Sequence, residues 1–242
     1  MKPKIDNNEI KKNDLEFDEF SESYRNIHLD STNASEDELD DFAEYKVIEV
    51  ARIVNNLNLP TSLNVLDFGS GVGNSVPYFK KYMSDSRLTC LDVSPKSLEV
   101  AESRFQEWAK YVLFDGKSIP FPDNHFDFVF SACVFHHISP VEHEKVLSEI
   151  YRVLRPGGRL AIFEHNPYNP ITVRIVNQCI FDRDAILINA GQLVSKLNKA
   201  GFNKIVKKYC MFFPYSLRLL RIVERWLTWI PLGAQYYALA KK

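Results

Sequence analysis

Apolar and polar positions follow two different periods along most of this chain. Short apolar runs have the length of buried strands, whereas the segments between them place apolar residues three or four positions apart, as helices do. The first helix is expected over residues 36–57, where Phe42, Val47, Val50 and Val54 fall on one face. Strands are expected over residues 63–68, 88–93, 111–114, 126–132 and 159–163.

Helical segments separate these strands. They are expected over residues 74–83, from Pro95 onward with Ser94 as the N-cap, over residues 141–154 and over residues 192–200. Strands that alternate with helices predict an α/β fold, with a doubly wound, mostly parallel sheet covered by helices on both faces. A closing pair of strands is expected at residues 204–213 and 236–240.

Composition and net charge limit the class of protein. The chain has 242 residues, 45% of them hydrophobic and 25% charged, which suits one globular domain with a sizeable core. The net charge of −1 gives no general attraction for nucleic acid. No apolar run follows Met1, and no stretch reaches the ~18 apolar residues of a membrane-spanning helix, so we expect a cytoplasmic protein. The four separated cysteines are expected as buried, reduced thiols.

Charge is distributed unevenly between the two ends of the chain. Residues 1–40 form an acidic segment, which we treat apart from the main domain at residues 41–242. From Lys196 onward, Glu224 is the only acidic residue among many lysines and arginines. The two ends are therefore expected to make different contacts.

The most informative stretch is the glycine-rich segment 67–73, Asp-Phe-Gly-Ser-Gly-Val-Gly. It lies between a predicted strand and a predicted helix, where glycines let the backbone turn sharply and approach a ligand. The dinucleotide-binding pattern would have its third glycine at the position of Asn74, whereas this chain has it one residue earlier, at Gly73. Asp67 precedes the first glycine by two residues. Such a loop suits a ligand with a carboxylate and an ammonium group better than a phosphate.

Two further acids follow the next two predicted strands. Asp92 ends the second strand, where a carboxylate can accept hydrogen bonds from both hydroxyls of a ribose. Asp115 follows the third strand, where it can accept a hydrogen bond from an adenine amino group. Each acid alone could simply face water at a strand end. Together with Asp67 they line the edge at which open α/β sheets bind ligands.

These features resemble the motifs of the class I S-adenosylmethionine (SAM)-dependent methyltransferases that act on small molecules. The resemblance covers residues 42–200. It rests on the glycine motif, on Asp92 and Asp115, on Phe-Asp-Phe-Val at residues 126–129 and on Leu-Arg-Pro-Gly-Gly at residues 154–158. It implies a Rossmann-like sheet of seven strands with an antiparallel last hairpin, and SAM as the cofactor. The cofactor site that it implies comprises Asp67, Gly69, Ser70, Gly71, Gly73, Asp92, Val93, Asp115, Gly116 and Ser131.

Histidines follow the fourth predicted strand. A methyl transfer aligns an already activated donor and needs a base only where the acceptor loses a proton. His136 and His137 are candidate bases, because histidine titrates near neutrality, although either could instead brace the loop by hydrogen bonding. His143, on the next helix, is expected on a solvated face. No metal site is expected, since no acid or cysteine ligand set accompanies these histidines in the sequence.

A polar loop follows the fifth predicted strand, at residues 164–170 with the sequence Glu-His-Asn-Pro-Tyr-Asn-Pro. Prolines stiffen it, and its polar groups need partners wherever they are buried. The loop is therefore expected either to bind a polar acceptor or to be held together by its own side chains. We take His165 as a third candidate base, and Glu164, Asn166 and Tyr168 as candidate acceptor-binding residues.

The acidic segment around Tyr24 resembles the family's N-terminal lid, which closes over the cofactor and excludes water. The resemblance implies that Tyr24 contacts the substrate. The alternative is a disordered acidic tail.

Residues 216–230 predict an amphipathic helix with a basic face. This helix could pack on the sheet or on a second subunit. It could also lie on the inner face of a membrane, since arginines edged by tryptophan suit anionic headgroups, and the acceptor could then be lipid-linked. The apolar face comprises Leu219, Leu220, Val223, Trp226, Leu227 and Ile230, and the opposite face comprises Arg218, Arg221 and Arg225, with Trp229 near them.

The combined pattern predicts methyl transfer from SAM to oxygen or nitrogen of a small-molecule or lipid-linked glycan acceptor. One alternative is aminopropyl transfer from decarboxylated SAM on the same fold. The acid-rich amine pocket that this chemistry needs is not visible after the fourth predicted strand, where histidines stand instead. The other alternative is a non-catalytic module that binds SAM or docks to a membrane, because one fold can serve several functions.

Overall fold

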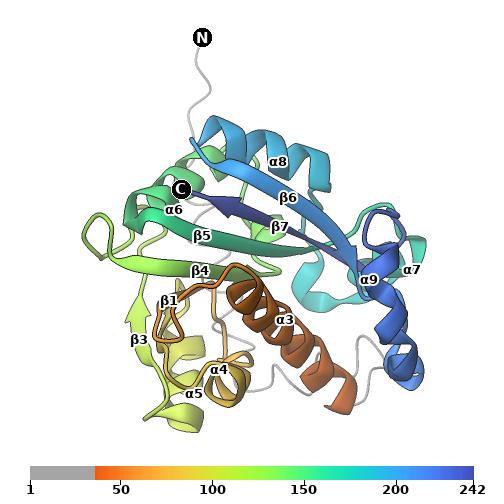
Figure 1. Cartoon of the computed structure of the whole chain (residues 1–242), viewed down its shortest axis with the longest axis horizontal. Helices are drawn as coiled ribbons and strands as arrows, with labels where there is room; N and C mark the ends of the chain where they lie inside the picture. Colours follow the sequence, from red (N-terminus) through yellow and green to blue (C-terminus); the bar gives the residue numbers. More distant parts are fainter. Residues whose placement is uncertain (1–35) are drawn as a thin grey trace.

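A sheet of seven strands crosses the computed structural model, which describes residues 36–242 (Figure 1). The strands span Asn64–Phe68 (β1), Arg87–Asp92 (β2), Lys110–Leu113 (β3), Phe126–Ala132 (β4), Leu154–His165 (β5), Asn203–Cys210 (β6) and Gln235–Lys241 (β7). Their order is β3-β2-β1-β4-β5-β7-β6, with β1 to β5 parallel and β7 antiparallel to both β5 and β6. The predicted doubly wound sheet with an antiparallel last hairpin is confirmed.

Helices cover both faces of this sheet (Figure 1). The α-helices span Glu36–Asn56 (α3), Val76–Tyr82 (α4), Pro95–Phe105 (α5), His143–Val153 (α6), Pro170–Gln178 (α7), Ala190–Lys199 (α8) and Glu224–Leu227 (α9), and the 3-10 helices span Phe135–His137 (η1), Ile180–Asp182 (η2) and Tyr215–Val223 (η3). Within residues 36–242, no helix is long and apolar enough to span a bilayer. Tyr24 and most of the acidic segment 1–40 lie outside the described residues.

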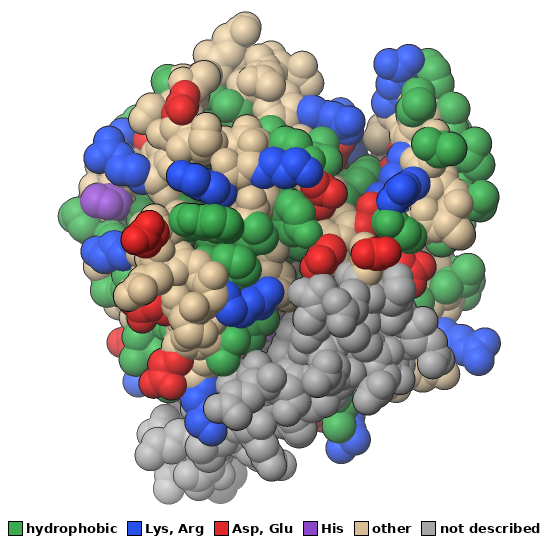
Figure 2. Space-filling view, turned by 90° about the horizontal axis from the view of Figure 1, so that it is seen from below, with side chains coloured by type: hydrophobic (Ala, Val, Ile, Leu, Met, Phe, Trp, Pro, Cys, Tyr) green, Lys and Arg blue, Asp and Glu red, His purple; other side chains and the backbone are tan. Residues whose placement is uncertain are grey.

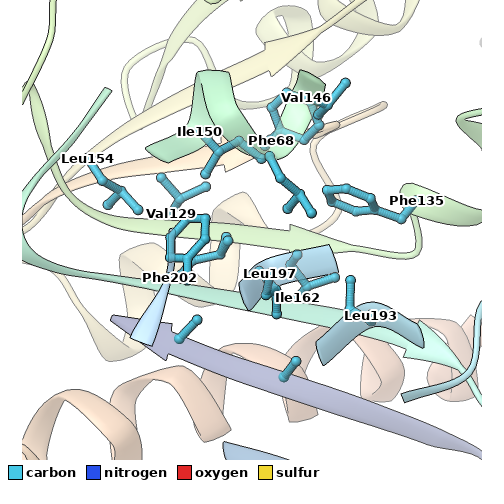
Figure 3. Packing of buried hydrophobic residues seen from close by; sticks show 14 of the residues in the cluster. Phe68, Val129, Phe135, Val146, Ile150, Leu154, Ile162, Leu193, Leu197 and Phe202 are labelled. Carbon is cyan, nitrogen blue, oxygen red and sulfur yellow. The ribbon is translucent and has the colours of Figure 1, made fainter. Parts of the chain in front are cut away.

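Two apolar cores lie on opposite faces of the sheet. On one face α3 and α4 pack against the strands, and on the other α6 and α8 do so. Figure 3 shows the second core, in which Ile150 of α6 and Leu197 of α8 lie in one cluster with Val129 of β4 and Ile162 of β5. Each fully buried aliphatic side chain of this kind stabilises the fold by ~1.5–3 kcal/mol. Packing in the two cores holds the strands in place and so positions the sheet edge on which the predicted site residues lie.

Local signals explain where several elements begin. Ser94 caps α5 as predicted, since its hydroxyl accepts a hydrogen bond from the Ser97 N–H at 3.0 Å. α7 was not predicted, although Asn169 caps it through the N–H groups of Ile171 and Thr172 (3.0 and 3.1 Å). The loop predicted at residues 164–170 therefore leads directly into a helix.

The segment predicted as one helix over residues 216–230 has a different structure. η3 is a 3-10 helix, and only the four residues of α9 are α-helical. The N–H of Glu224 closes the last turn of η3 on the Arg221 carbonyl, and side chains three residues apart are eclipsed in such a turn, so Arg221 and Glu224 both face α3. There Arg221 pairs with Asp41 (Nη2–Oδ2 2.6 Å), and Glu224 accepts a hydrogen bond from the Tyr45 hydroxyl (2.8 Å). These contacts favour the tighter helix.

This anchoring excludes the alternative in which the segment packs its apolar face on the sheet. Arg221, expected on the exposed basic face, packs against α3 instead. The predicted apolar face is turned toward solvent, where Leu219 is 82% exposed. The segment therefore presents apolar side chains outward rather than burying them in its own core.

Candidate active site

The glycine loop after β1 meets the loop after β4. Gly69 has φ +75°, and a Cβ at this position would clash with a methyl carbon of Val134, so both its conformation and its surroundings require glycine. The strand order reverses between β1 and β4. Ligands of open α/β sheets bind at such a switch point, outside the carboxyl ends of the strands.

Hydrogen bonds tie this glycine loop to the end of β2. The N–H groups of Gly69 and Ser70 donate to the Leu91 carbonyl (2.8 and 3.1 Å). The N–H of Gly71 donates to Oδ2 of Asp92 at 2.7 Å. The acid predicted to bind ribose thus also fixes the loop beside it.

Asp67 lies beneath the loop and is almost fully buried. Its carboxylate accepts a hydrogen bond from the Ser75 hydroxyl. Burial raises the pKa of Asp67 to about 7, with the Ser75 hydrogen bond acting in the opposite direction. A neighbouring cation would favour the ionised form. This position therefore suits the ammonium group expected in the ligand.

The other predicted cofactor residues occupy the ends of the neighbouring strands. Asp115 is exposed, and hydrogen bonds from the backbone N–H groups of Ser118 and Lys117 (2.9 and 2.8 Å) lower its pKa. Ser131 is fully buried in β4, and its hydroxyl has no hydrogen-bond partner among residues 36–242. The remaining positions are Val93 and Gly116, which follow β2 and β3, and Gly73 at the end of the glycine loop.

A buried carboxylate joins β5 to the loop after β4. Oε1 of Glu164 accepts hydrogen bonds from the N–H groups of Val134 (3.0 Å) and Phe135 (2.7 Å). Oε2 lies 2.6 Å from Nδ1 of His136, and both side chains are at most 1% exposed. Val134 thus touches the glycine loop through its side chain and Glu164 through its backbone. The predicted cofactor and acceptor residues are parts of one assembly.

His136 lies between two carboxylates. Its Nε2 is 3.2 Å from Oδ1 of Asp182, the last residue of η2. Burial lowers the pKa of His136, but the carboxylates of Glu164 and Asp182 outweigh it and raise the pKa to about 10. With these partners the imidazole is a cation at neutral pH and accepts no further proton.

The two other predicted histidines differ from His136 in their surroundings. Nε2 of His137 lies 3.4 Å from Oδ1 of Asp182, and burial together with the cationic His136 lowers the pKa of His137 to about 3. His165 is partly buried, and its ring centroid lies 5.1 Å from that of His136. Because His137 is a weak base and His136 is already protonated, His165 is the best placed of the three to meet an incoming group.

Cys133 adds a sulfur to this site. The residue has φ +59°, and its thiol lies 3.5 Å from Nζ of Lys46 and 3.4 Å from Nε2 of Gln235. Burial raises the pKa of the thiol, but Lys46 and a hydrogen bond from His165 lower it to about 6. Cys90, Cys179 and Cys210 are buried as expected, whereas Cys133 is partly exposed. This thiol was not distinguished from the other three in the sequence.

The loop after β5 is held largely by its own polar groups. The amide of Asn166 is fully buried and donates to the carbonyls of Pro231 (3.1 Å) and Gly233 (2.8 Å). Its Oδ1 accepts a hydrogen bond from the Tyr168 N–H at 3.1 Å. The scaffolding alternative therefore describes Asn166, while the Tyr168 side chain is exposed and open to a ligand.

His143 does not lie on a solvated face as expected. It is buried at the start of α6, and its Nε2 lies 2.8 Å and 2.9 Å from the carbonyls of Phe135 and Ile138. The loop that carries His136 folds back over the first turn of α6 and covers His143 there. The side chain braces the histidine loop from below.

Three members of the site lie far from their partners in the sequence. Asp182 is 46 residues from His136, Lys46 is 87 residues from Cys133, and Gln235 is 102 residues from Cys133. One signal could have identified Lys46, because it shares a helix face with apolar residues at four-residue spacing. Asp182 and Gln235 carry no such local signal.

Comparison with known proteins places this geometry among methyltransferases. A family model described as a methyltransferase domain matches residues 66–162, which include the glycine loop and the ends of β1 to β4. An uncharacterised methyltransferase of Synechocystis is 30% identical over 164 residues, covering 64% of this chain and 74% of that protein.

Other curated relatives match over a smaller share. The ubiquinone/menaquinone biosynthesis C-methyltransferase of Psychromonas ingrahamii is 31% identical over 116 residues, 45% of each chain. The demethylmenaquinone methyltransferase of Thermus thermophilus is 32% identical over 134 residues, 54% of this chain and 59% of that protein. The chain thus spans about half the length of these two relatives.

Solved structures agree on the fold. A SAM-dependent methyltransferase from Thermotoga maritima has a TM-score of 0.66 and 18% identity, and the match covers 93% of this chain and 98% of that one. A second, from Aquifex aeolicus, has a TM-score of 0.60 and 20% identity, with 86% and 93% covered. At these identities the likeness concerns the arrangement of the elements.

Proposed function

Since the chain belongs to the class I SAM-dependent methyltransferases, we propose that it transfers the methyl group of SAM to a small-molecule or lipid-linked acceptor. The observation that carries this proposal is the position of Val134, which contacts Gly69 of the glycine loop and donates a hydrogen bond to Glu164 of the histidine cluster. The residues expected to bind the methyl donor and those expected to bind the methyl acceptor are therefore both held by Val134. Such support serves methyl transfer, in which alignment of the reacting groups supplies most of the rate.

In this proposal the cofactor lies across the ends of β1, β2 and β3. Asp67 meets the ammonium group, the glycine loop meets the methionine portion, Asp92 accepts from the ribose hydroxyls, and Asp115 accepts from the adenine amino group. The buried, unpartnered hydroxyl of Ser131 supports a ligand group at the end of β4. Ser70, Val93 and Gly116 complete the lining.

We assign proton handling to the cluster of His136, His137 and His165. Glu164 and Asp182 hold His136, and the resulting cation weakens His137, so the open member of the cluster is His165. Glu164 and Asn166 shape the acceptor side from within, and Tyr168 and Tyr24 would meet the acceptor itself. Oxygen or nitrogen is the expected site of attack. The names of two relatives favour carbon of a quinone-like ring as the second candidate.

Aminopropyl transfer is less well supported. No acid-rich pocket was visible in the sequence after the fourth predicted strand, but in the structure Glu164 and Asp182 lie beside the histidines. Both carboxylates are engaged by His136. A polyamine substrate needs carboxylates that are free to pair with its ammonium groups. Engaged carboxylates do not offer this.

A membrane-associated acceptor is supported by an apolar and basic surface near the site. Tyr168 and exposed apolar and basic residues of α7 and of segment 215–232 form one surface, hereafter the apolar–basic patch. Its two parts are joined by the hydrogen bond from Asn169 Nδ2 to the Leu232 carbonyl (2.7 Å). Viewed from below, hydrophobic and basic side chains gather on the projecting side of the molecule where α7 and α9 lie (Figure 2). We propose that the protein is cytoplasmic and contacts the inner membrane face peripherally. The patch comprises Tyr168, Ile171, Arg174, Ile175, Leu217, Arg218, Leu219, Leu220, Ile222, Arg225, Trp226, Trp229 and Leu232.

Calorimetric titration with SAM and with S-adenosylhomocysteine tests the cofactor assignment. We expect micromolar binding of both, weakened at least ~10-fold in Asp92→Ala, which corresponds to about 1.4 kcal/mol. Asp123→Ala, an exposed acid on another loop, is the matched control and should bind normally. Absence of binding in the wild type would remove the proposed function. Binding of SAM without methylation of any lipid or small-molecule fraction would favour the non-catalytic alternative.

A further inference from the structure

We propose that His136, His165 and Asp182 bind a divalent transition-metal ion on the acceptor side of the site. One donor atom from each residue lies within 4.8 Å of the other two. Nε2 of His136 and Oδ1 of Asp182 are 3.2 Å apart. This separation is close to the ~3.4 Å edge of a tetrahedron whose ligands stand ~2.1 Å from the metal. Metal binding would displace the proton on Nε2 of His136 to solvent, and small side-chain adjustments would then suffice to complete the coordination.

The residues around these three ligands resemble the outer shell of metal sites. A metal-binding histidine usually donates its second ring N–H to a carboxylate, which fixes the tautomer and the ring orientation. His136 has this arrangement, with Nδ1 2.6 Å from Glu164. Glu164 is itself held by two backbone N–H groups. His165 is positioned by its hydrogen bond with Cys133.

The ligand set also limits the kind of ion. Two imidazoles and one carboxylate form the set found in catalytic zinc sites and in the facial triads of non-haem iron(II) proteins. Such sites leave coordination positions open for water or substrate. His165 and Asp182 are only partly buried, so an open position would face the side from which an acceptor arrives.

This inference goes beyond the proposed function, because methyl transfer itself requires no metal. A bound ion would act as a Lewis acid on an acceptor hydroxyl and promote loss of its proton to water, and the oxygen would then take the methyl group as its bond to the SAM sulfur breaks. In the metal-bound protein, His165 would contribute as a ligand rather than as a free base. This site was not predicted from the sequence, since Asp182 reaches the histidines only through the fold.

Metal titration of the chelator-treated full-length protein tests the proposal. Zn²⁺ is titrated calorimetrically, and Co²⁺ is followed by its visible absorption, which reports the geometry of the ligands. We expect one ion per chain. Binding should be lost in Asp182→Asn and in His165→Gln. It should persist in two matched controls, Asp184→Asn, an exposed acid two residues away, and His125→Gln, a histidine stacked on Phe121 outside the site.

The outcomes separate this proposal from the proposed function. SAM titration of each variant shows that the cofactor side of the fold is intact. Absence of Zn²⁺ and Co²⁺ binding in the wild type, or unchanged binding in Asp182→Asn, would overturn the metal site and leave the cluster as a buried ion pair. Methylation by metal-free protein at the full rate would restrict the ion to a non-catalytic role and overturn its assignment to the acceptor. SAM binding would be unaffected in each case.

Discussion

The imidazole of His136 and the carboxylate of Glu164 form a buried ion pair with Nδ1 and Oε2 2.6 Å apart. Glu164 is the penultimate residue of β5, and His136 lies in η1 after β4. The parallel sheet alone brings the end of β5 and the loop after β4 only to the same edge. The ion pair fixes their relative position. The second oxygen of Glu164 holds the backbone of the same histidine loop.

Replacing Glu164 with glutamine should destabilise the protein strongly. The substitution leaves the buried His136 cation with Asp182 as its remaining carboxylate partner, and removal of one partner of a buried pair costs ~3–5 kcal/mol. The measurement is urea-induced unfolding. Glu144→Gln is the control, because its pair with Lys199 is exposed and should contribute only ~0–1 kcal/mol. Equal losses in the two variants would contradict the central role given to Glu164.

A methyl group at Gly69 should destabilise the loop more than one at Gly71. Both positions have positive φ, which costs an alanine ~1–2 kcal/mol. At Gly69 the new Cβ also meets Val134, and overpacking adds ~1–3 kcal/mol, whereas a Cβ at Gly71 meets nothing within 4 Å. Unfolding of unliganded Gly69→Ala and Gly71→Ala measures the difference directly. A smaller loss for Gly69→Ala would show that the two loops separate easily.

SAM binding should depend on pH through Asp67. Burial raises the pKa of this carboxyl to about 7 in the unliganded protein. The shift favours folding below the ordinary aspartate pKa, and this contribution is lost as the pH rises through about 7. A cationic ligand needs the ionised form, so affinity should rise roughly fivefold between pH 6 and pH 7. In this range the ligand's own α-amino group, with a pKa of ~7.7–8.0, stays largely protonated.

Calorimetry at the two pH values, in buffers of different ionisation enthalpy, measures both the affinity and the proton released. Asp67→Asn should bind more weakly and lose the pH dependence. Ser75→Ala should keep the dependence but shift it upward, since the hydroxyl stabilises the ionised form. A pH dependence that persists in Asp67→Asn would assign the titration to another group.

Removal of the His165 imidazole should affect turnover and spare the cofactor. Loss of a general base typically lowers the rate by ~10²–10⁴-fold, and loss of a metal ligand would also lower it. His165→Ala is compared with His125→Ala in steady-state methylation, with SAM affinity measured separately. Unchanged turnover in His165→Ala would exclude the residue from the chemistry.

The parts of the site that could be predicted from sequence are those fixed by local structure. The glycine loop, Asp92 and the Ser94 cap each depend on residues within one strand–turn–helix unit, and periodicity locates such units. The fold class follows from the same alternation. Asn166 lay in the predicted loop, but its role depends on carbonyls more than 60 residues away.

The remaining parts depend on contacts between distant segments. Asp182 lies in a short 3-10 helix without periodicity, and only the fold brings it to His136. The exposure of the apolar face of segment 215–232 has a similar cause. Amphipathicity predicts which side chains share a face but not which face is anchored, and here the Arg221–Asp41 and Glu224–Tyr45 contacts decide it.

The apolar–basic patch should bind anionic membranes. Its side chains include Leu219, Ile222 and Trp229, which are 82%, 71% and 77% exposed, and Glu224, the only acid of segment 215–232, is buried. Apolar side chains that enter the headgroup region beside arginines are attracted to anionic lipid, and salt screens the attraction. We expect the wild type to float with anionic vesicles at low salt, less at high salt, and little with neutral vesicles.

Combined L219E, I222E and W229E substitutions should abolish flotation while SAM binding persists. Trp108→Glu is the control, because this exposed tryptophan precedes β3 at the opposite edge of the sheet. Flotation that is equal in the triple variant would assign the exposed apolar side chains to another partner.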